Sequence, residues 1–369
     1  MPGYFALCAM QCDTLYIYDV TNTAAPVLRG NISGAGAPNF LNNVYNAHVV
    51  GNYAYVAAPG DNSLTIIDIS NPDNPVYVGH IAGAGAPNFL NYAWNLRVVG
   101  NYAYVVCRDE DSLTIIDITN PVAPAYVGHI AGAGAPNFLN NPYGVFIAGN
   151  LAYITCYVEN SLTIIDITNP AAPAYVGHIA GGANWLNAPR GLDVVGNYAY
   201  VASEFTDSLT IIDVTNPAAP FHAAHLNGAG APNFLNGAYD VCIVGNFALV
   251  AVRMDSSLTV VDITNPLAPA FVNHIAGLGV PPHLGLAAII RIVGTDAFLT
   301  GDGVGDRGLI IIDVANPAVP VFVSWTASPG PPGIESIHGM SYWFVPPLPL
   351  PLPPPPVSVV TLPATEVRA

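Results

Sequence analysis

Charge is what this sequence lacks most. Asp, Glu, Lys and Arg make up 9% of its 369 residues, against roughly 25% in an average soluble protein. Lysine is absent, so all eight basic residues are arginines, and 24 acidic residues bring the formal net charge to −16. With so few cations, no basic patch is available for nucleic acid, which is therefore excluded as a partner. Networks of surface ion pairs are excluded too, because too few charges exist to build them.

Long hydrophobic runs and targeting signals are also missing. The stretch 118–158 carries no charged residue, but prolines and asparagines interrupt it. No run approaches the roughly 20 apolar residues of a transmembrane helix, so we predict no membrane insertion. No basic segment followed by an apolar one opens the chain, so no signal peptide is visible. Either the protein is cytosolic or the sequence begins after a processed segment.

The motifs of the common enzyme classes are absent as well. The sequence contains no Cys-x-x-Cys, His-Glu-x-x-His, Gly-x-Ser-x-Gly, P-loop or Rossmann fingerprint. Its five cysteines do not form a disulfide framework. We therefore predict no catalytic residue, no metal site and no cofactor.

What the sequence does contain is a repeat of about 50 residues. The segment Leu64 to Ile69 (Leu-Thr-Ile-Ile-Asp-Ile) recurs with a following Asn-Pro turn, and its aspartate stands at Asp19, Asp68, Asp117, Asp166, Asp213, Asp262 and Asp313. A period of this length is typical of a β-propeller. Each copy has four Val-, Ile- and Tyr-rich stretches separated by Gly, Asn and Pro. Apolar residues occur on both strand faces, as sheets covered by neighbouring blades require. We predict an all-β, seven-bladed β-propeller of four-stranded blades over residues 1–345.

The two chain ends are predicted to close the ring. Residues 4–32 supply three strands of a blade that lacks its innermost one, and Ile334 to Ile337 lies where that strand should come. Tyr342 to Val345 then reads as a surplus second strand. A proline-rich spacer over 346–356 and a strand-like tail over 357–369 complete the chain.

The segment Leu-Thr-Ile-Ile-Asp-Ile-(Ser/Thr)-Asn-Pro, preceded by Gly-Asn-Tyr-Ala-Tyr-Val, resembles the LVIVD-repeat family of β-propellers over about residues 4–345. The resemblance implies a surface-associated bacterial or archaeal propeller with no assigned activity. One departure is the nine-residue loop Gly-Ala-Gly-Ala-Pro-Asn-Phe-Leu-Asn, which is longer than a usual blade crossover. It occurs at 34–42, 83–91, 132–140 and 228–236.

The repeated aspartate and one position of the innermost strands are two of the recurring positions that could carry chemistry. We interpret the aspartate as structural, accepting backbone N–H bonds before the Asn-Pro turn. The innermost-strand position varies while its neighbours stay apolar, and it is occupied by His48, Arg97, Phe146, Asp193, Cys242 and Arg291. If it faces the axis, it lines the channel where a propeller ligand binds. An enzyme there would use His48 as base, Arg97 and Arg291 to bind an anion and Asp193 to orient the base; the alternative is a water-filled channel.

Acidic residues gather on the turns between second and third strands: Asp61, Asp109, Glu110, Asp111, Glu159, Asp207, Asp255 and Asp306. In an up-and-down blade these turns share a face with the crossover loops. We interpret them as a solvated acidic rim. The alternative is a ligand face for calcium or a carbohydrate.

The tail combines a stiff spacer with a strand. Residues 346–356 favour polyproline II, and Val357, Val359, Val360 and Leu362 give the next segment strand propensity. Such a strand suits addition to the sheet edge of a neighbouring molecule, and a disordered linker is the alternative.

The leading functional hypothesis is a non-enzymatic structural propeller that self-assembles through this tail into a homo-oligomer or filament, at the cell surface or outside the cell. The second hypothesis is a monomeric propeller that captures a ligand on its acidic loop face. The third is an enzyme at the central channel.

Overall fold

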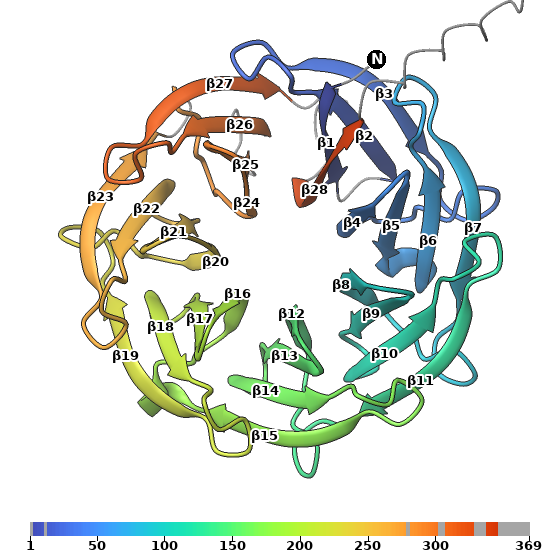
Figure 1. The fold of residues 1–369 in the computed structure, drawn as a ribbon, viewed down its shortest axis with the longest axis horizontal. Helices are drawn as coiled ribbons and strands as arrows, with labels where there is room; N and C mark the ends of the chain where they lie inside the picture. The colour runs from blue at the N-terminus through green and yellow to red at the C-terminus, as the bar shows by residue number, and fades with distance from the viewer. Residues whose placement is uncertain (1–2, 11–12, 278–280, 302–306, 328–336, 346–369) are drawn as a thin grey trace, which may run out of the picture.

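The protein is a ring of four-stranded β-sheets around a central channel (Figure 1). The computed structural model describes residues 3–10, 13–277, 281–301, 307–327 and 337–345, the first and last of these as backbone alone. Within these ranges there is no α-helix, and the two single-turn 3-10 helices are Pro59–Asp61 and Gly182–Asn184. None of the described helices is long or apolar enough to span a membrane. The predicted all-β propeller with four-stranded blades is confirmed.

Six sheets are each built from four consecutive strands, arranged from the channel outward. The innermost strands are β4 (Asn46–Val50), β8 (Ala93–Val99), β12 (Pro142–Ala148), β16 (Pro189–Val195), β20 (Ala238–Val244) and β24 (Ile290–Val293). The second strands are β5 (Tyr53–Ala58), β9 (Tyr102–Cys107), β13 (Leu151–Cys156), β17 (Tyr198–Ser203), β21 (Phe247–Val252) and β25 (Asp296–Gly301).

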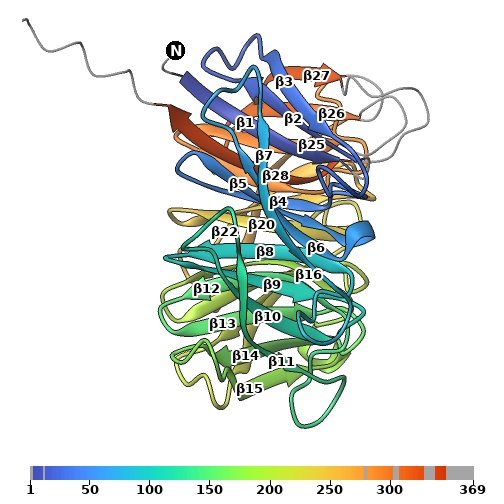
Figure 2. The same cartoon turned by 90° about the vertical axis from the view of Figure 1, so that its right-hand side faces the viewer.

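The third and outermost strands complete these six sheets. The third strands are β6 (Ser63–Asp68), β10 (Ser112–Asp117), β14 (Ser161–Asp166), β18 (Ser208–Asp213), β22 (Ser257–Asp262) and β26 (Gly308–Asp313). The outermost are β7 (Val76–Ala82), β11 (Ala125–Ala131), β15 (Ala174–Ala180), β19 (Phe221–Asn227), β23 (Ala270–Ala276) and β27 (Val321–Ala327). Seen from the side, the strands run between the two faces of a disc, where the connecting loops lie (Figure 2).

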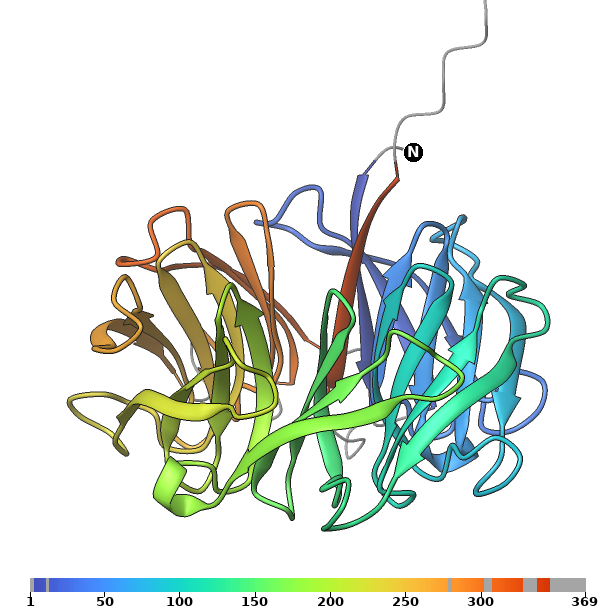
Figure 3. The same cartoon turned by 60° about the horizontal axis from the view of Figure 1, so that its bottom comes forward.

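The seventh sheet joins the two ends of the chain. Its order is β28 (Ile337–Val345), β1 (Gly3–Met10), β2 (Thr14–Asp19) and β3 (Val27–Ser33). β28 pairs antiparallel with β1 and lies beside it along its length (Figure 3). The interpretation of Tyr342 to Val345 as a surplus strand is wrong, because one continuous strand begins at Ile337 and supplies the missing innermost position. Residues 334–336 and 346–369, including Val357, Val359, Val360 and Leu362, lie outside the described residues.

The core lies between blades rather than within one. In β10 all residues from Ser112 to Ile116 are buried, so both faces of this third strand are covered. Ile66 of β6 and Val105 of β9 belong to one apolar cluster between two neighbouring blades. The innermost and outermost strands are less buried, as the half-exposed residues of β11 show. Each interface between neighbouring blades is therefore a separate apolar layer.

Neighbouring blades approach closely at the fourth residue of the outermost strands, here called the seam position. At Gly128 an added Cβ would lie 2.5 Å from the carbonyl oxygen of Pro170, in the Asn-Pro turn of the next blade. The other seam positions hold Gly30, Gly79, Gly177, Ala224, Asn273 and Ser324. Ser324 donates a hydrogen bond of 2.5 Å to the carbonyl oxygen of Thr23. The same contact therefore also joins the blade of β27 to the sheet that contains β1.

Three contacts hold each nine-residue crossover loop, as in the copy over 83–91. The Glu110 carboxylate accepts the Gly85 N–H at 3.0 Å, and the buried Thr114 hydroxyl donates to the Phe89 carbonyl at 2.7 Å. The Phe89 ring stacks on the His129 imidazole with 3.7 Å between centroids. The threonine of Leu-Thr-Ile-Ile-Asp is therefore a loop anchor, a role that sequence reasoning missed.

The structural interpretation of the repeated aspartate is confirmed. Asp117 accepts the Thr119 N–H at 2.8 Å, and hydrogen bonding by the Thr119 side chain and N–H lowers the pKa of this carboxyl group. The carboxylates of the other six copies accept the N–H two residues later in the same way: Asp19, Asp68, Asp166, Asp213, Asp262 and Asp313. This bond fixes the turn that reaches the neighbouring blade.

The seam contact predicts a position-dependent cost for one substitution. In Gly128→Ala the new methyl group would meet backbone atoms of the next blade, which cannot rotate away, so we expect a loss of about 1–3 kcal/mol in the free energy of unfolding. Gly182→Ala is the matched control, because nothing lies within 4 Å of its added Cβ. Urea denaturation of both variants measures the difference, and equal losses would contradict a tight seam.

Candidate functional site

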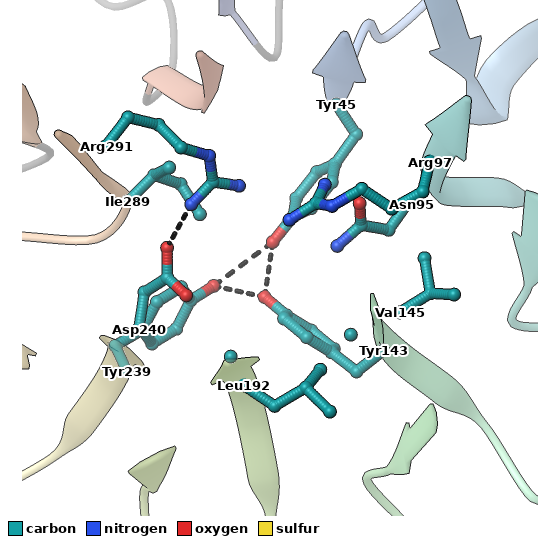
Figure 4. A pocket seen from close by; sticks show the side chains of 12 residues that line it. Tyr45, Asn95, Arg97, Tyr143, Val145, Leu192, Tyr239, Asp240, Ile289 and Arg291 are labelled. Atoms are coloured by element: carbon teal, nitrogen blue, oxygen red, sulfur yellow. Dashed lines mark hydrogen bonds and ion pairs between the residues drawn. The ribbon is translucent and has the colours of Figure 1, made fainter. Parts of the chain in front are cut away.

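The central channel is the candidate site, and the innermost strands bring the predicted position to its wall. Arg97 on β8 and Arg291 on β24 line a cavity of about 20 Å³ in the channel, part of it open to solvent (Figure 4). His48, Phe146, Asp193 and Cys242 occupy the same strand position but do not line this cavity. The structure thus brings together only two of the six predicted channel residues.

His48 and Asp193 join blades instead of facing a ligand. The Val98 N–H donates to His48 Nδ1 at 2.9 Å, and the Ile243 N–H donates to Asp193 Oδ2 at 2.9 Å. In both cases the donor lies on the innermost strand of the next blade. Burial, together with the positive charges of Arg97 and Arg291, lowers the pKa of His48 to about 3. A neutral imidazole with its Nδ1 occupied is a poor general base at neutral pH.

Cys242 and Phe146 do not provide chemistry either. Burial raises the pKa of the Cys242 thiol to about 12, so the reactive thiolate is absent at neutral pH. Phe146 packs against the apolar cluster between the blades of β14 and β17. The predicted set of base, orienting group and anion ligands is therefore not assembled as one unit.

A cluster of aromatic side chains lies across one end of the cavity. The hydroxyl groups of Tyr45, Tyr143 and Tyr239 contact one another in a triangle, with 3.2 Å between Tyr45 and Tyr239 and shorter contacts to Tyr143 (Figure 4). We call these three residues the tyrosine floor. Their rings are at most 3% exposed, and burial raises the pKa values of Tyr45 and Tyr143. The Tyr45 and Tyr143 hydroxyls therefore stay protonated and uncharged.

Arginines stack on these rings from the crossover-loop side. The Arg190 guanidinium lies 4.6 Å from the Tyr143 ring centroid and 4.8 Å from that of Tyr239. Arg190 is also paired with Glu204, its Nε donating to the carboxylate at 2.7 Å. Arg253 lies 4.8 Å over Tyr239. These cation–π contacts stiffen the tyrosine floor.

Sequence reasoning missed the tyrosine floor, although a signal for it exists. Tyr45, Trp94, Tyr143 and Tyr239 stand at one repeat position, directly at the start of the innermost strands. The Trp94 ring stacks on Tyr45 with 3.3 Å between centroids. A large aromatic residue recurring at the inner end of several blades indicates packing on the axis, where the blades converge.

Two side chains of β8 present hydrogen-bond donors to the cavity. Asn95 and Arg97 are two residues apart, so they lie on the same strand face, and both line the cavity. Asn95 Oδ1 accepts the Leu96 N–H at 2.8 Å, which leaves its amide N–H₂ group for the cavity. Arg97 donates from Nη1 to the Leu96 carbonyl at 3.1 Å, its only hydrogen bond within the described residues. Its other N–H donors have no acceptor among the described residues.

The acidic residues of the predicted rim bind the crossover loops. Asp61 accepts N–H groups of Gly36 and Asn42. The same type of bond, from crossover-loop N–H groups, is accepted by Glu110, Asp111, Glu159, Asp207 and Asp255. The loops fold back onto these half-buried carboxylates and use them as acceptors, a structural role that the interpretation as a solvated rim did not include. Asp109 is exposed, and Asp306 lies outside the described residues.

No ion site is formed by these acids in the described part of the chain. There, no three His, Cys, Asp or Glu side chains gather closely enough to hold a metal ion.

The environment of His48 predicts a loss of stability in mild acid. Its pKa is about 3 in the folded protein and about 6.5 in the unfolded chain. The neutral His48 side chain therefore makes its full contribution to the free energy of unfolding above about pH 6.5, and this contribution decreases as the pH falls toward 3. We expect the free energy of unfolding at about pH 5 to be lower than at pH 7.5 by on the order of 1 kcal/mol from this residue, because solvent in the channel screens part of the effect.

Urea denaturation at the two pH values tests this on the wild type and on His48→Asn, whose side-chain oxygen can still accept the Val98 N–H. The variant should lose part of the pH dependence. His222→Asn, on the half-exposed outermost strand β19, is the control and should change it less. An unaltered pH dependence in His48→Asn contradicts the assignment.

Solved structures confirm the architecture at low sequence identity. A functionally unknown protein from Desulfotomaculum acetoxidans is 15% identical, with a TM-score of 0.67 over 93% of this chain and 99% of the other. A protein from Lactobacillus plantarum is 12% identical, with a TM-score of 0.73 over 94% and 100%. A periplasmic gluconolactonase from Pseudomonas aeruginosa is 11% identical, with a TM-score of 0.68 over 93% and 99%. Such identities establish the fold alone.

Sequence comparison identifies a family for this chain but no individual curated relative. No curated protein is significantly similar to this chain. The model of the LVIVD repeat, in contrast, matches it six times, over residues 43–82, 91–131, 143–180, 189–225, 237–276 and 303–326. These matches cover most of the chain and coincide with the blades described above. The chain therefore belongs to the family of LVIVD-repeat proteins.

Proposed function

We propose that this protein is a non-catalytic binding propeller that holds a small organic carboxylate in its central channel. The observation that carries the proposal is the pair of donors on β8. Arg97 and Asn95 line one cavity and have N–H groups without a partner among the described residues. Unpaired donors in a confined site favour a ligand that brings acceptors.

A carboxylate suits these donors better than a neutral acceptor. A guanidinium can bind both carboxylate oxygens through parallel hydrogen bonds, which are stronger than bonds between neutral groups. Burial and repulsion from Arg291 lower the pKa of Arg97 to about 10, although the charges of Asp240 and Asp193 act in the opposite direction, so this residue is still positively charged at neutral pH. An anion beside it would offset both unfavourable effects.

Binding is favoured over catalysis by the state of the reactive groups. The imidazole of His48 and the carboxylate of Asp193 accept backbone N–H bonds between blades, and burial raises the pKa of the Cys242 thiol. The gluconolactonase among the structural neighbours makes an enzyme the alternative. It is disfavoured because no described group in the cavity is arranged as a general base or an activated nucleophile.

Replacing Arg97 tests the proposal. Isothermal titration calorimetry with acetate, lactate and gluconate identifies a binding carboxylate for the wild type. We expect Arg97→Met to weaken its binding roughly 10- to 100-fold, because hydrogen bonds to charged groups contribute about 1.5–3 kcal/mol. Arg29→Met is the matched control: Arg29 pairs with Asp19 and Asp73 away from the channel, and its loss should leave binding unchanged. No binding to the wild type, or equal weakening in both variants, overturns the proposal.

Self-assembly through the tail remains a second hypothesis for the same protein, together with a location at the cell surface or outside the cell. It rests on the sequence, in which a proline-rich spacer precedes the β-branched segment 357–362. A chain ending at Val345 keeps every described strand and lacks the tail.

Light scattering and negative-stain electron microscopy of the full and shortened chains test this hypothesis. We expect polymers that disappear on truncation, since the added strand would be lost. Monomers in both samples would remove the hypothesis and leave the channel as the functional site.

A further inference from the structure

We propose that the outer rim of the ring has a site for one divalent transition-metal ion, of the copper, nickel or zinc type, between His222 and His225. Both residues lie on β19, the outermost strand of its sheet (Figure 1). Two strands separate β19 from the innermost strand β16. The inference therefore goes beyond the proposed function and does not depend on a ligand in the channel.

A β-bulge brings the two imidazoles to the same side of β19. Side chains three residues apart on a regular strand point to opposite faces. The pairing of β19 with β18 shifts register between Ile211 and Ile212, which gives β19 one extra residue between His222 and Ala224. His222 therefore lies beside His225, with 3.2 Å between His222 Nε2 and His225 Nδ1.

The separation of these two nitrogen atoms suits a shared metal ion. Metal–imidazole bonds are about 2.0–2.1 Å long. Two nitrogens bound to one ion therefore lie about 2.9 Å apart at a right angle and about 3.4 Å apart at the tetrahedral angle. The observed 3.2 Å falls between these values. Rotation of the half-buried His222 ring, which breaks the hydrogen bond between the imidazoles, would let both lone pairs meet at an ion.

The protonation state of the pair also suits metal binding. Burial lowers the pKa of both imidazoles, and the neighbouring His222 lowers that of His225 further. Both rings are therefore neutral at neutral pH, the form that binds metal. One proton lies between the facing nitrogens. When an ion binds there, the donor ring carries this proton on its other nitrogen, so the ion replaces one hydrogen bond and both rings stay neutral.

The same strand position in other blades lacks the second nitrogen. In β7, β11 and β15 a tyrosine hydroxyl lies within hydrogen-bond distance of the histidine Nδ1, as Tyr175 does at 2.7 Å from His178. Burial raises the pKa of Tyr175, so this phenol stays protonated and is a poor metal ligand. β23 has Phe271 at this position. Among the outermost strands, histidine occupies both positions in β19 alone.

Trp185 orients His225 before an ion arrives. Its ring stacks on the imidazole with 3.8 Å between centroids, and its carbonyl oxygen accepts a hydrogen bond of 2.8 Å from the Thr210 hydroxyl. A ligand that is already held in place loses less conformational freedom when it binds. The stacking also gives the site an optical signal, because a paramagnetic Cu(II) ion on His225 would quench the fluorescence of Trp185.

The donor set favours Cu(II) among the possible ions. Imidazole nitrogens bind copper, nickel and zinc, and for a given set of ligands Cu(II) binds most tightly. Two side chains supply ligands here, so water would fill the remaining positions of the ion. The formal net charge of −16 favours the approach of a cation.

Titration of the full-length protein with Cu(II), followed by tryptophan fluorescence, tests the site. We expect the first equivalent to bind the wild type and to quench part of its emission. His222→Tyr reproduces the tyrosine–histidine pair of β15, and we expect it to weaken binding by roughly tenfold or more, because one of two ligands is lost. His178→Tyr is the matched control: it removes a single imidazole from β15 and should leave the affinity unchanged.

Trp185→Phe determines where the ion binds. Phenylalanine keeps the stacking that Phe138 makes on His178. We therefore expect calorimetry to show Cu(II) binding as in the wild type, while most of the quenching disappears. Equal affinity of the wild type and His222→Tyr overturns the inference, as does quenching that persists in Trp185→Phe.

Discussion

In the six sheets built from consecutive strands, the two middle strands are buried on both faces, and the rest of the molecule depends on this constraint. Such a sheet must be covered by another sheet on each side, so no blade has a stable place outside the ring. The seam positions set how closely the covering blades approach. Where Gly128 meets the carbonyl of Pro170, no side chain fits between two backbones. At the last blade a Ser324 hydroxyl uses the same contact to reach Thr23.

The repeat allowed the fold to be predicted because each copy carries the whole signal for one blade. Periodicity could not show which crossover-loop atoms reach which side chains. Acidic turns that look solvent-facing in sequence, such as Glu110, accept N–H groups from a loop about 25 residues away. The prediction of two separate strands near the C-terminal end of the propeller failed for a related reason. Pairing with β1 makes the whole of Ile337–Val345 one strand, β28.

The candidate site was harder to predict than the fold. The innermost-strand position was correctly placed at the channel, yet of its six residues only Arg97 and Arg291 line the cavity. A register shift between Ala93 and Asn95 alters how β8 presents its side chains. Asn95 and the tyrosine floor lie at other positions of the repeat. They line the cavity because the blades converge on the axis of the ring. Similar blades thus surround a channel with unlike walls, because each blade contributes different polar residues to it.

The sheet that holds both chain ends couples the ring to protein synthesis. β1 emerges first and β28 last, with more than 300 residues between the partners that pair. Until the last strand leaves the ribosome, the first blade lacks its innermost strand and the ring has an open side. Long-range pairing of this kind slows folding and leaves apolar surface exposed in the meantime. A chain interrupted before β28 would therefore be an open ring, exposed to aggregation or proteolysis, so the ring can close only after β28 has been synthesised.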